Sequence, residues 1–107
     1  MTDTLTAEQA LGLTITERTR FRVRMRIIGE SGRERTAWIR GARSIHECQT
    51  RYVAKREHFG LGGSRFLDGD VFDESGQLVA RISYNGRCWH PAPWTPDSKP
   101  VAEAPPR

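Results

Sequence analysis

The chain has 107 residues, 36% of them hydrophobic and 28% charged, with a formal net charge of +4, and this length suits one domain. It has no apolar run of about 18 residues and no basic, apolar leader, so we expect neither a membrane span nor a secretory signal. Its two cysteines, Cys48 and Cys88, are too few for a disulfide scaffold. Composition therefore excludes large enzymes, membrane proteins and disulfide-rich domains, and favours a cytoplasmic protein with free thiols.

The positive charge is concentrated in one block. Residues 18–65 contain 13 of the 17 Lys and Arg residues against 4 glutamates, and 15 of those 17 bases are arginine. Arginine binds phosphate and carboxylate in a bidentate way, which lysine does not. A dense arginine block indicates either a polyanionic or acidic partner or a solvated surface.

We expect a flexible arm over residues 1–16. The clearest predicted strand covers residues 17–28, because arginines alternate there with mostly apolar residues. The basic set is Arg18, Arg20, Arg22, Arg24 and Arg26. The other set is Thr19, Phe21, Val23, Met25 and Ile27. Side chains two apart on a strand lie about 6.7 Å apart, which is near the phosphate spacing of an extended single strand.

Residues 30–32, Glu-Ser-Gly, predict a three-residue hairpin loop with Gly32 in the left-handed conformation. On the buried face the resulting register gives the pairs Met25–Ala37 and Val23–Ile39. On the arginine face it gives the pairs Arg26–Thr36, Arg24–Trp38 and Arg22–Arg40. Both faces are satisfied together, which supports this register.

A helix is expected from the Ser44–Glu47 capping box to Phe59, with Gly60 as its C-terminal cap. Its apolar stripe is predicted to comprise Ile45, Cys48, Tyr52 and Phe59, with Gln49 and Val53 beside it. The opposite face is basic and carries Arg51, Lys55 and His58.

The second half predicts three strands, at 67–71, 78–84 and 87–90, joined by turns at 73–76 and at Asn85-Gly86. The Asn-Gly pair favours a type I′ turn, which would pack Trp89 against Ile82. Residues 91–107 hold all six prolines and predict a disordered tail, in which Trp94 is either incidental or a docking residue.

These elements predict an α+β domain over residues 17–90, with the order ββαβββ and one helix on one face of an antiparallel sheet of about five strands. The His-x-Cys pair at 46–48 and the Cys-x-His pair at 88–90 contain ligand types that suit zinc. The first pair cannot chelate one ion, since i and i+2 diverge on a helix, and Cys48 belongs to the apolar stripe, so no metal and no cofactor are expected. Asp68 and Asp70 are expected to pair with Arg65 or Arg81. No nucleophile elbow, P-loop or zinc-protease motif is present, and an enzyme is not expected.

Residues 44–90 resemble a pattern found in small proteins of phages, plasmids and integrated elements. The resemblance rests on a helix that leads into GGSRFLDGDVFDESGQLVAR and on the closing strand NGRCW. Some small anti-CRISPR proteins have this plan of helix, acidic-turn hairpin and closing G-(R/K)-x-W strand. The resemblance implies a non-enzymatic inhibitor that blocks a nucleoprotein defence complex through surface charge, with no small-molecule substrate.

The sequence thus predicts a small basic binding protein with two open targets. One is nucleic acid, single- or double-stranded, and the other is a CRISPR-type nucleoprotein complex of the host. The predicted contact residues are Arg20, Arg22, Arg24, Arg26, Trp38 and Arg40, with Arg51 and Lys55 as secondary contacts.

Overall fold

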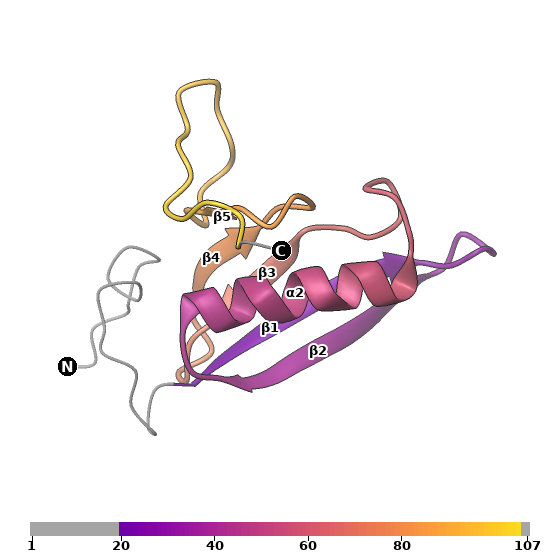
Figure 1. Cartoon of the computed structure of the whole chain (residues 1–107), viewed down its shortest axis with the longest axis horizontal. Helices are drawn as coiled ribbons and strands as arrows, with labels where there is room; N and C mark the ends of the chain where they lie inside the picture. Colours follow the sequence, from indigo (N-terminus) through magenta and orange to yellow (C-terminus); the bar gives the residue numbers. More distant parts are fainter. Residues whose placement is uncertain (1–19, 106–107) are drawn as a thin grey trace.

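The computed structural model describes residues 20–105 and contains one helix and five strands (Figure 1). The elements are β1 (Phe21–Ile28), β2 (Glu34–Ala42), α2 (Ile45–Phe59), β3 (Gly69–Phe72), β4 (Leu78–Ile82) and β5 (Cys88–Trp89). The strands form one antiparallel sheet in the order β2-β1-β3-β4-β5, so the predicted α+β fold is confirmed. The predicted arm at 1–16, and Arg18 with it, lies outside the described residues.

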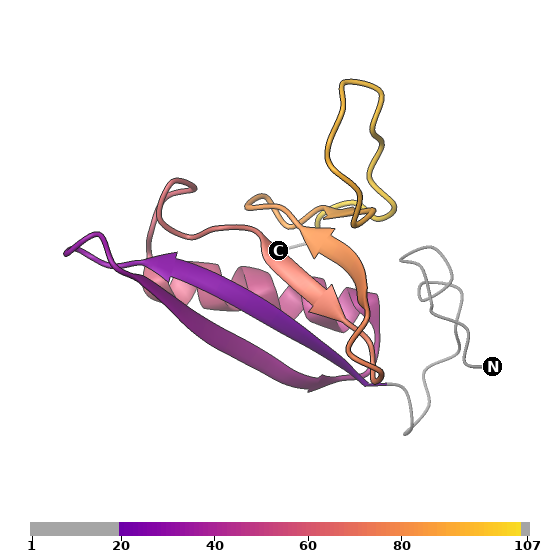
Figure 2. The ribbon, with the colours of Figure 1, turned by 180° about the vertical axis from the view of Figure 1, so that it is seen from behind.

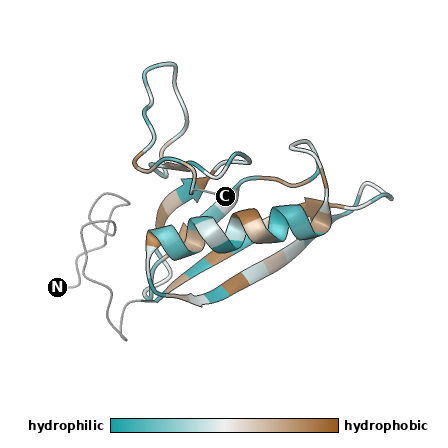
Figure 3. Cartoon of the chain, viewed as in Figure 1, coloured by the Kyte–Doolittle hydropathy of each residue, from teal (hydrophilic) through white to brown (hydrophobic). Residues whose placement is uncertain are grey.

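The helix covers one face of the sheet. Seen from behind, after a turn of 180°, the sheet lies in front of the helix and shows its other face (Figure 2). The reason is the alternation in β1, whose buried residues Phe21, Val23, Met25 and Ile27 all face α2. Bands of hydrophilic and hydrophobic residues along the strands follow this two-sided pattern (Figure 3). The arginines of β1 therefore lie on the face away from the helix.

Tyr52 is the centre of the contact between helix and sheet. It is fully buried, its ring centroid lies 5.2 Å from that of Phe66, and its hydroxyl donates a 2.8 Å hydrogen bond to the Leu67 carbonyl. A Cβ at Gly69 would lie 2.9 Å from Val23 Cγ1 and 3.0 Å from Tyr52 Cδ1. Only glycine allows β3 to pass this close to the helix.

All three hairpins use the same three-residue loop, closed by two backbone hydrogen bonds and by a glycine with positive φ at Gly32, Gly76 or Gly86. The prediction for residues 30–32 is therefore confirmed. The predicted type I′ turn at Asn85-Gly86 is wrong, because no residue other than glycine has positive φ within 20–105. Asn85 instead accepts a hydrogen bond from the Arg87 amide (3.1 Å) through its side chain.

The helix begins and ends where predicted. The Ser44 hydroxyl accepts a 3.0 Å hydrogen bond from the Glu47 amide, and Gly60 has φ 66°. The predicted apolar stripe is wrong at its last position, because Phe59 is 42% exposed. Arg56 takes the buried place, since its Nη1 donates to the Tyr84 carbonyl at 2.6 Å and its guanidinium lies 5.1 Å from the Tyr84 ring.

The predicted disordered tail differs from the structure over residues 101–105. The Cys88 amide donates to the Ala102 carbonyl (2.9 Å), and the Val101 amide donates to the Cys88 carbonyl (2.8 Å). The buried Gln49 side chain donates to the Glu103 carbonyl at 2.8 Å. These residues are ordered because β5 is an edge strand. Its free backbone groups can pair with another backbone segment whatever the side chains of that segment are.

Candidate nucleic-acid interface

The sheet face opposite α2 gathers most of the basic residues that the sequence singles out. We call this surface the arginine face, and it consists of Arg22, Arg24 and Arg26 on β1, Trp38 and Arg40 on β2, Asp70 and Phe72 on β3, and Arg81 on β4. The register brings them together: Arg24 lies between Trp38 and Asp70, and Asp70 pairs with Arg81. No helix among residues 20–105 covers this face.

Two aromatic rings lie among the arginines and contact them face-on. The centroids of Trp38 and Phe72 are 6.0 Å apart. The guanidinium carbons of Arg22 and Arg40 each lie 5.6 Å from the Trp38 ring, and that of Arg24 lies 5.3 Å from the Phe72 ring. Cation–π contacts of this kind hold flexible arginine side chains against a fixed platform, with planar surfaces available for stacking.

Asp70 is the acidic centre of this surface. Its side chain is only 7% exposed, and one carboxylate oxygen accepts hydrogen bonds from Arg24 Nε (3.1 Å) and Nη2 (2.9 Å). Arg26 Nε and Arg81 Nε each lie 3.9 Å from the same carboxylate, which is beyond hydrogen-bond distance. One carboxylate therefore holds three arginines in place and leaves the surface with excess positive charge.

The Asp70→Asn variant should separate stability from surface charge. We expect a loss of about 1–2 kcal/mol in unfolding free energy, since three arginines, themselves partly screened by water, lose the carboxylate that they surround. The same variant should bind a single-stranded oligonucleotide more tightly, because the arginine face gains one net positive charge. Urea unfolding and fluorescence anisotropy measure the two effects, and weaker binding by the folded variant would contradict this account.

The pairs Val23–Ile39, Met25–Ala37, Arg24–Trp38 and Arg26–Thr36 are confirmed. The expected pairing of Arg22 with Arg40 is wrong, because a β-bulge shifts the register between Phe21 and Val23. The bulge still leaves both arginines against the Trp38 ring. Arg20 precedes β1 and continues its alternation.

The predicted secondary contacts Arg51 and Lys55 belong to the helix layer. Arg51 Nη1 donates to the Arg40 carbonyl (2.9 Å) and contacts Glu47 (3.3 Å) at the edge of the sheet. Lys55 lines a shallow depression on α2 with Arg51 and His58. The structure therefore does not place these two residues on the arginine face.

The position of Trp89 differs from the sequence prediction. It was expected to pack against Ile82, but the register pairs Ile82 with Cys88 and Arg81 with Trp89. The three-residue loop, one residue longer than a type I′ turn, turns Trp89 to the face that carries Arg81. The sequence analysis therefore placed Trp89 on the wrong face and missed Phe72, which period-two counting from Asp70 could have found.

Thiols and metal-ligating side chains do not form a reactive centre in the described part of the chain. Burial raises the pKa of the Cys48 and Cys88 thiols to about 12, which keeps both in the unreactive neutral form. Within residues 20–105 no group of three or more His, Cys, Asp or Glu side chains could hold a metal ion. No helix of these residues is long and apolar enough to cross a membrane.

Comparison of the chain with protein-family models, curated proteins and solved structures finds no match.

Proposed function

We propose that the chain is a non-enzymatic binding protein whose arginine face holds single-stranded nucleic acid. The observation that carries this proposal is the gathering of five arginines and two aromatic rings on one sheet face, with Asp70 as the acid among them. Proteins that hold single strands combine a basic surface for the phosphates with aromatic or guanidinium planes on which bases stack. Arg24 and Arg26 have side chains 41% and 38% exposed, so both can reach a ligand while Arg24 is hydrogen-bonded to Asp70 and Arg26 lies 3.9 Å from it.

The width of the sheet favours a single strand over a duplex. Five strands at the usual spacing extend over about 19 Å. The major groove of B-form DNA is about 12 Å wide and accepts a helix or a two-stranded ribbon. A broad face with exposed planar groups can contact splayed bases, which a duplex keeps stacked inside.

A salt titration tests this proposal. A labelled single strand of about 10 nucleotides should bind with a log–log salt slope near −0.7 per phosphate contact, or about −3 if Arg22, Arg24, Arg26 and Arg40 each neutralise one phosphate. Fluorescence anisotropy at several salt concentrations gives the slope. No binding at about 50 mM salt, or an affinity independent of salt, would overturn the proposal.

A second candidate function is inhibition of a nucleoprotein defence complex, the role implied by the resemblance to anti-CRISPR proteins. The observation that favours it is Trp38, 37% exposed between two arginines, since Trp and Arg dominate the hot spots of protein interfaces. Here the arginine face would occupy an acidic or nucleic-acid-binding surface of the complex. Retention of a purified CRISPR effector complex on the immobilised chain after nuclease treatment would favour this candidate, and loss of capture would favour the nucleic-acid proposal.

A further inference from the structure

A cavity of about 660 Å³ adjoins the arginine face at its β4–β5 side, beneath the loop of residues 91–99. Its lining includes Asp68, Arg81, Trp89, Trp94 and Lys99. The volume falls within the range of small-ligand pockets, and the combination of aromatic and cationic walls suits a planar ligand with a negative charge. Arg81 belongs both to the arginine face and to this cavity, so the two surfaces are continuous.

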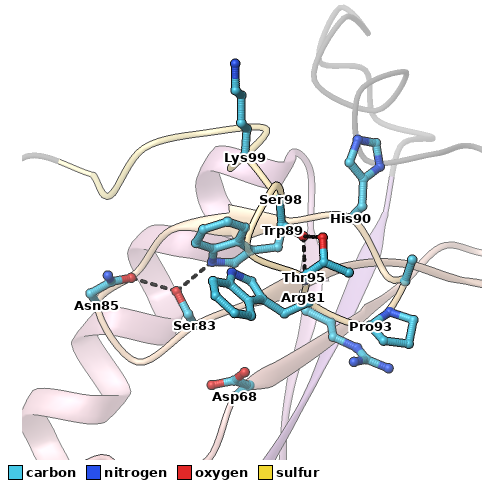
Figure 4. A pocket seen from close by; sticks show the side chains of 12 residues that line it. Asp68, Arg81, Ser83, Asn85, Trp89, His90, Pro93, Thr95, Ser98 and Lys99 are labelled. Atoms are coloured by element: carbon cyan, nitrogen blue, oxygen red, sulfur yellow. Dashed lines mark hydrogen bonds between the residues drawn. The ribbon is translucent and has the colours of Figure 1, made fainter.

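The Trp89 ring is held in a fixed orientation. Its indole nitrogen donates to Ser83 Oγ (2.9 Å), and Ser83 donates in turn to Asn85 Oδ1 (2.6 Å), as the dashed lines of Figure 4 show. Strand pairing places Trp89 beside Arg81, and in Figure 4 Asp68 lies on the other side of the cavity from Lys99. A stacking surface that is already immobilised loses little entropy when a ligand binds.

Trp94 supplies a second aromatic wall from a loop that is itself closed. The Thr95 amide donates to Ser98 Oγ (2.8 Å), and the Ser98 amide donates to the Thr95 carbonyl (2.9 Å). Trp94 is 65% exposed, the highest value among the large hydrophobic residues of 20–105. An indole held at the rim of a cavity and exposed to water has apolar area to bury against a ligand.

We propose that this cavity receives one unstacked base of the strand whose phosphates lie on the arginine face. The inference rests on the proposed function, because Arg81 links the cavity to the row of phosphate-binding arginines. Stacking on Trp94 and Trp89 would be tolerant of sequence, since every base has a π-face. The Asp68 carboxyl and the Ser83 hydroxyl offer hydrogen-bonding groups to the edge of the base.

The Asp68 carboxyl is suited to this contact by its surroundings. Burial raises its pKa and the Asp70 carboxylate raises it further, whereas Arg26 and Arg81 lower it. The raised pKa reduces the cost of protonating Asp68, and a protonated carboxyl both donates and accepts. The geometry of the cavity carries the proposal, and this property adds to it.

The test compares two strands of about 10 nucleotides. One is a normal strand, and the other is abasic at every position, so it keeps the phosphates and lacks the bases. Trp94→Ala should weaken binding of the normal strand by about 5- to 150-fold and leave binding of the abasic strand and the salt slope unchanged. Trp94→Phe, which keeps a stacking ring, should restore most of the affinity. Trp94 is exposed, so the fold does not depend on it, and circular dichroism checks that.

Three outcomes would overturn the inference in different ways. If Trp94→Ala binds the normal strand as wild type does, while Arg22→Glu with Arg40→Glu weakens binding, the cavity binds no base and the proposed function stands. If neither strand binds the wild-type protein at low salt, the proposed function itself fails. A nucleoside monophosphate that quenches tryptophan fluorescence with the affinity of the whole strand would assign the cavity to free nucleotides and contradict its link to the arginine face.

Discussion

Replacing Arg22 and Arg40 together by glutamate is expected to weaken binding of a single strand about 25-fold or more at 0.1 M salt. Loss of two phosphate contacts should also make the log–log salt slope less steep by about 1.4. Because phosphate contacts carry no sequence information, strands of different sequence should be affected equally. Anisotropy titrations of wild type and variant measure affinity and slope together.

These two positions are chosen because the fold does not depend on them. Both guanidinium groups contact the Trp38 ring, 5.6 Å from its centroid, and neither is bonded to Asp70. Arg24 is a poorer probe, because a glutamate there would face the buried Asp70 carboxylate and destabilise the protein. A loss of binding in the Arg22 and Arg40 variant therefore reports on the surface and not on unfolding.

The matched control reverses two charges on the other layer of the molecule. Arg51→Glu with Lys55→Glu changes the net charge by the same amount, but it replaces side chains of α2 and keeps every side chain of the arginine face. Among the described residues, the one contact with that face that it removes is the hydrogen bond from Arg51 to the Arg40 backbone carbonyl. This pair should retain most of the affinity, with only the small loss that lower net charge causes. Equal losses in both double variants would show that net charge alone governs binding and would contradict an interface on the sheet.

Tyr52→Ala should lower the unfolding free energy by about 3–5 kcal/mol, the largest effect that we expect on stability. The substitution removes a fully buried ring that contacts Phe66 and leaves the Leu67 carbonyl without its 2.8 Å hydrogen bond. A chain of this length has a net stability of about 5–15 kcal/mol, so the loss is a large share of it. Urea unfolding monitored by circular dichroism gives the value.

Tyr52→Phe separates packing from hydrogen bonding. It keeps the ring and removes only the hydroxyl, and we expect a loss of about 1–2 kcal/mol. If both substitutions cost the same, the hydrogen bond to Leu67 would be the main contribution and the packing account would be wrong. Tyr52 does not lie on the arginine face, so the folded fraction of each variant should bind nucleic acid normally.

The fold was largely predictable where local patterns decide it. The alternation in residues 17–28 and the capping box at Ser44 depend on neighbouring residues. The helix lies where expected, and β1 (Phe21–Ile28) lies within the predicted range. The turn at Asn85-Gly86 was not predictable from these two residues alone, because Ser83 and Arg87 close a longer loop than a type I′ turn. The docking of residues 101–105 could not be predicted for another reason. It depends on hydrogen bonds from backbone groups and from the Gln49 side chain, and a proline-rich composition does not indicate such bonds.

The part of the candidate site on the β1–β2 hairpin was predictable, and the contacts with β3 and β4 were not. Arg24 and Trp38 follow from a hairpin register, which a short loop fixes. The pairing of β1 with β3 joins residues 46 apart in sequence, so the ion pair between Arg24 and Asp70 could not be derived from spacing. The same long-range pairing brings Phe72 to the arginines and makes β1 an inner strand.

Mapping the bound strand onto the protein by NMR tests the central claim most directly. In a titration with a single strand of about 10 nucleotides, we predict the largest shifts at the Trp38 indole and at the amides and side chains of Arg22, Arg24 and Phe72. Signals of Arg51 and Lys55 on the helix should stay almost unchanged, while Trp94 should shift if the adjoining cavity receives a base. Shifts confined to α2, with the β1 and β2 signals unmoved at saturation, would contradict the account.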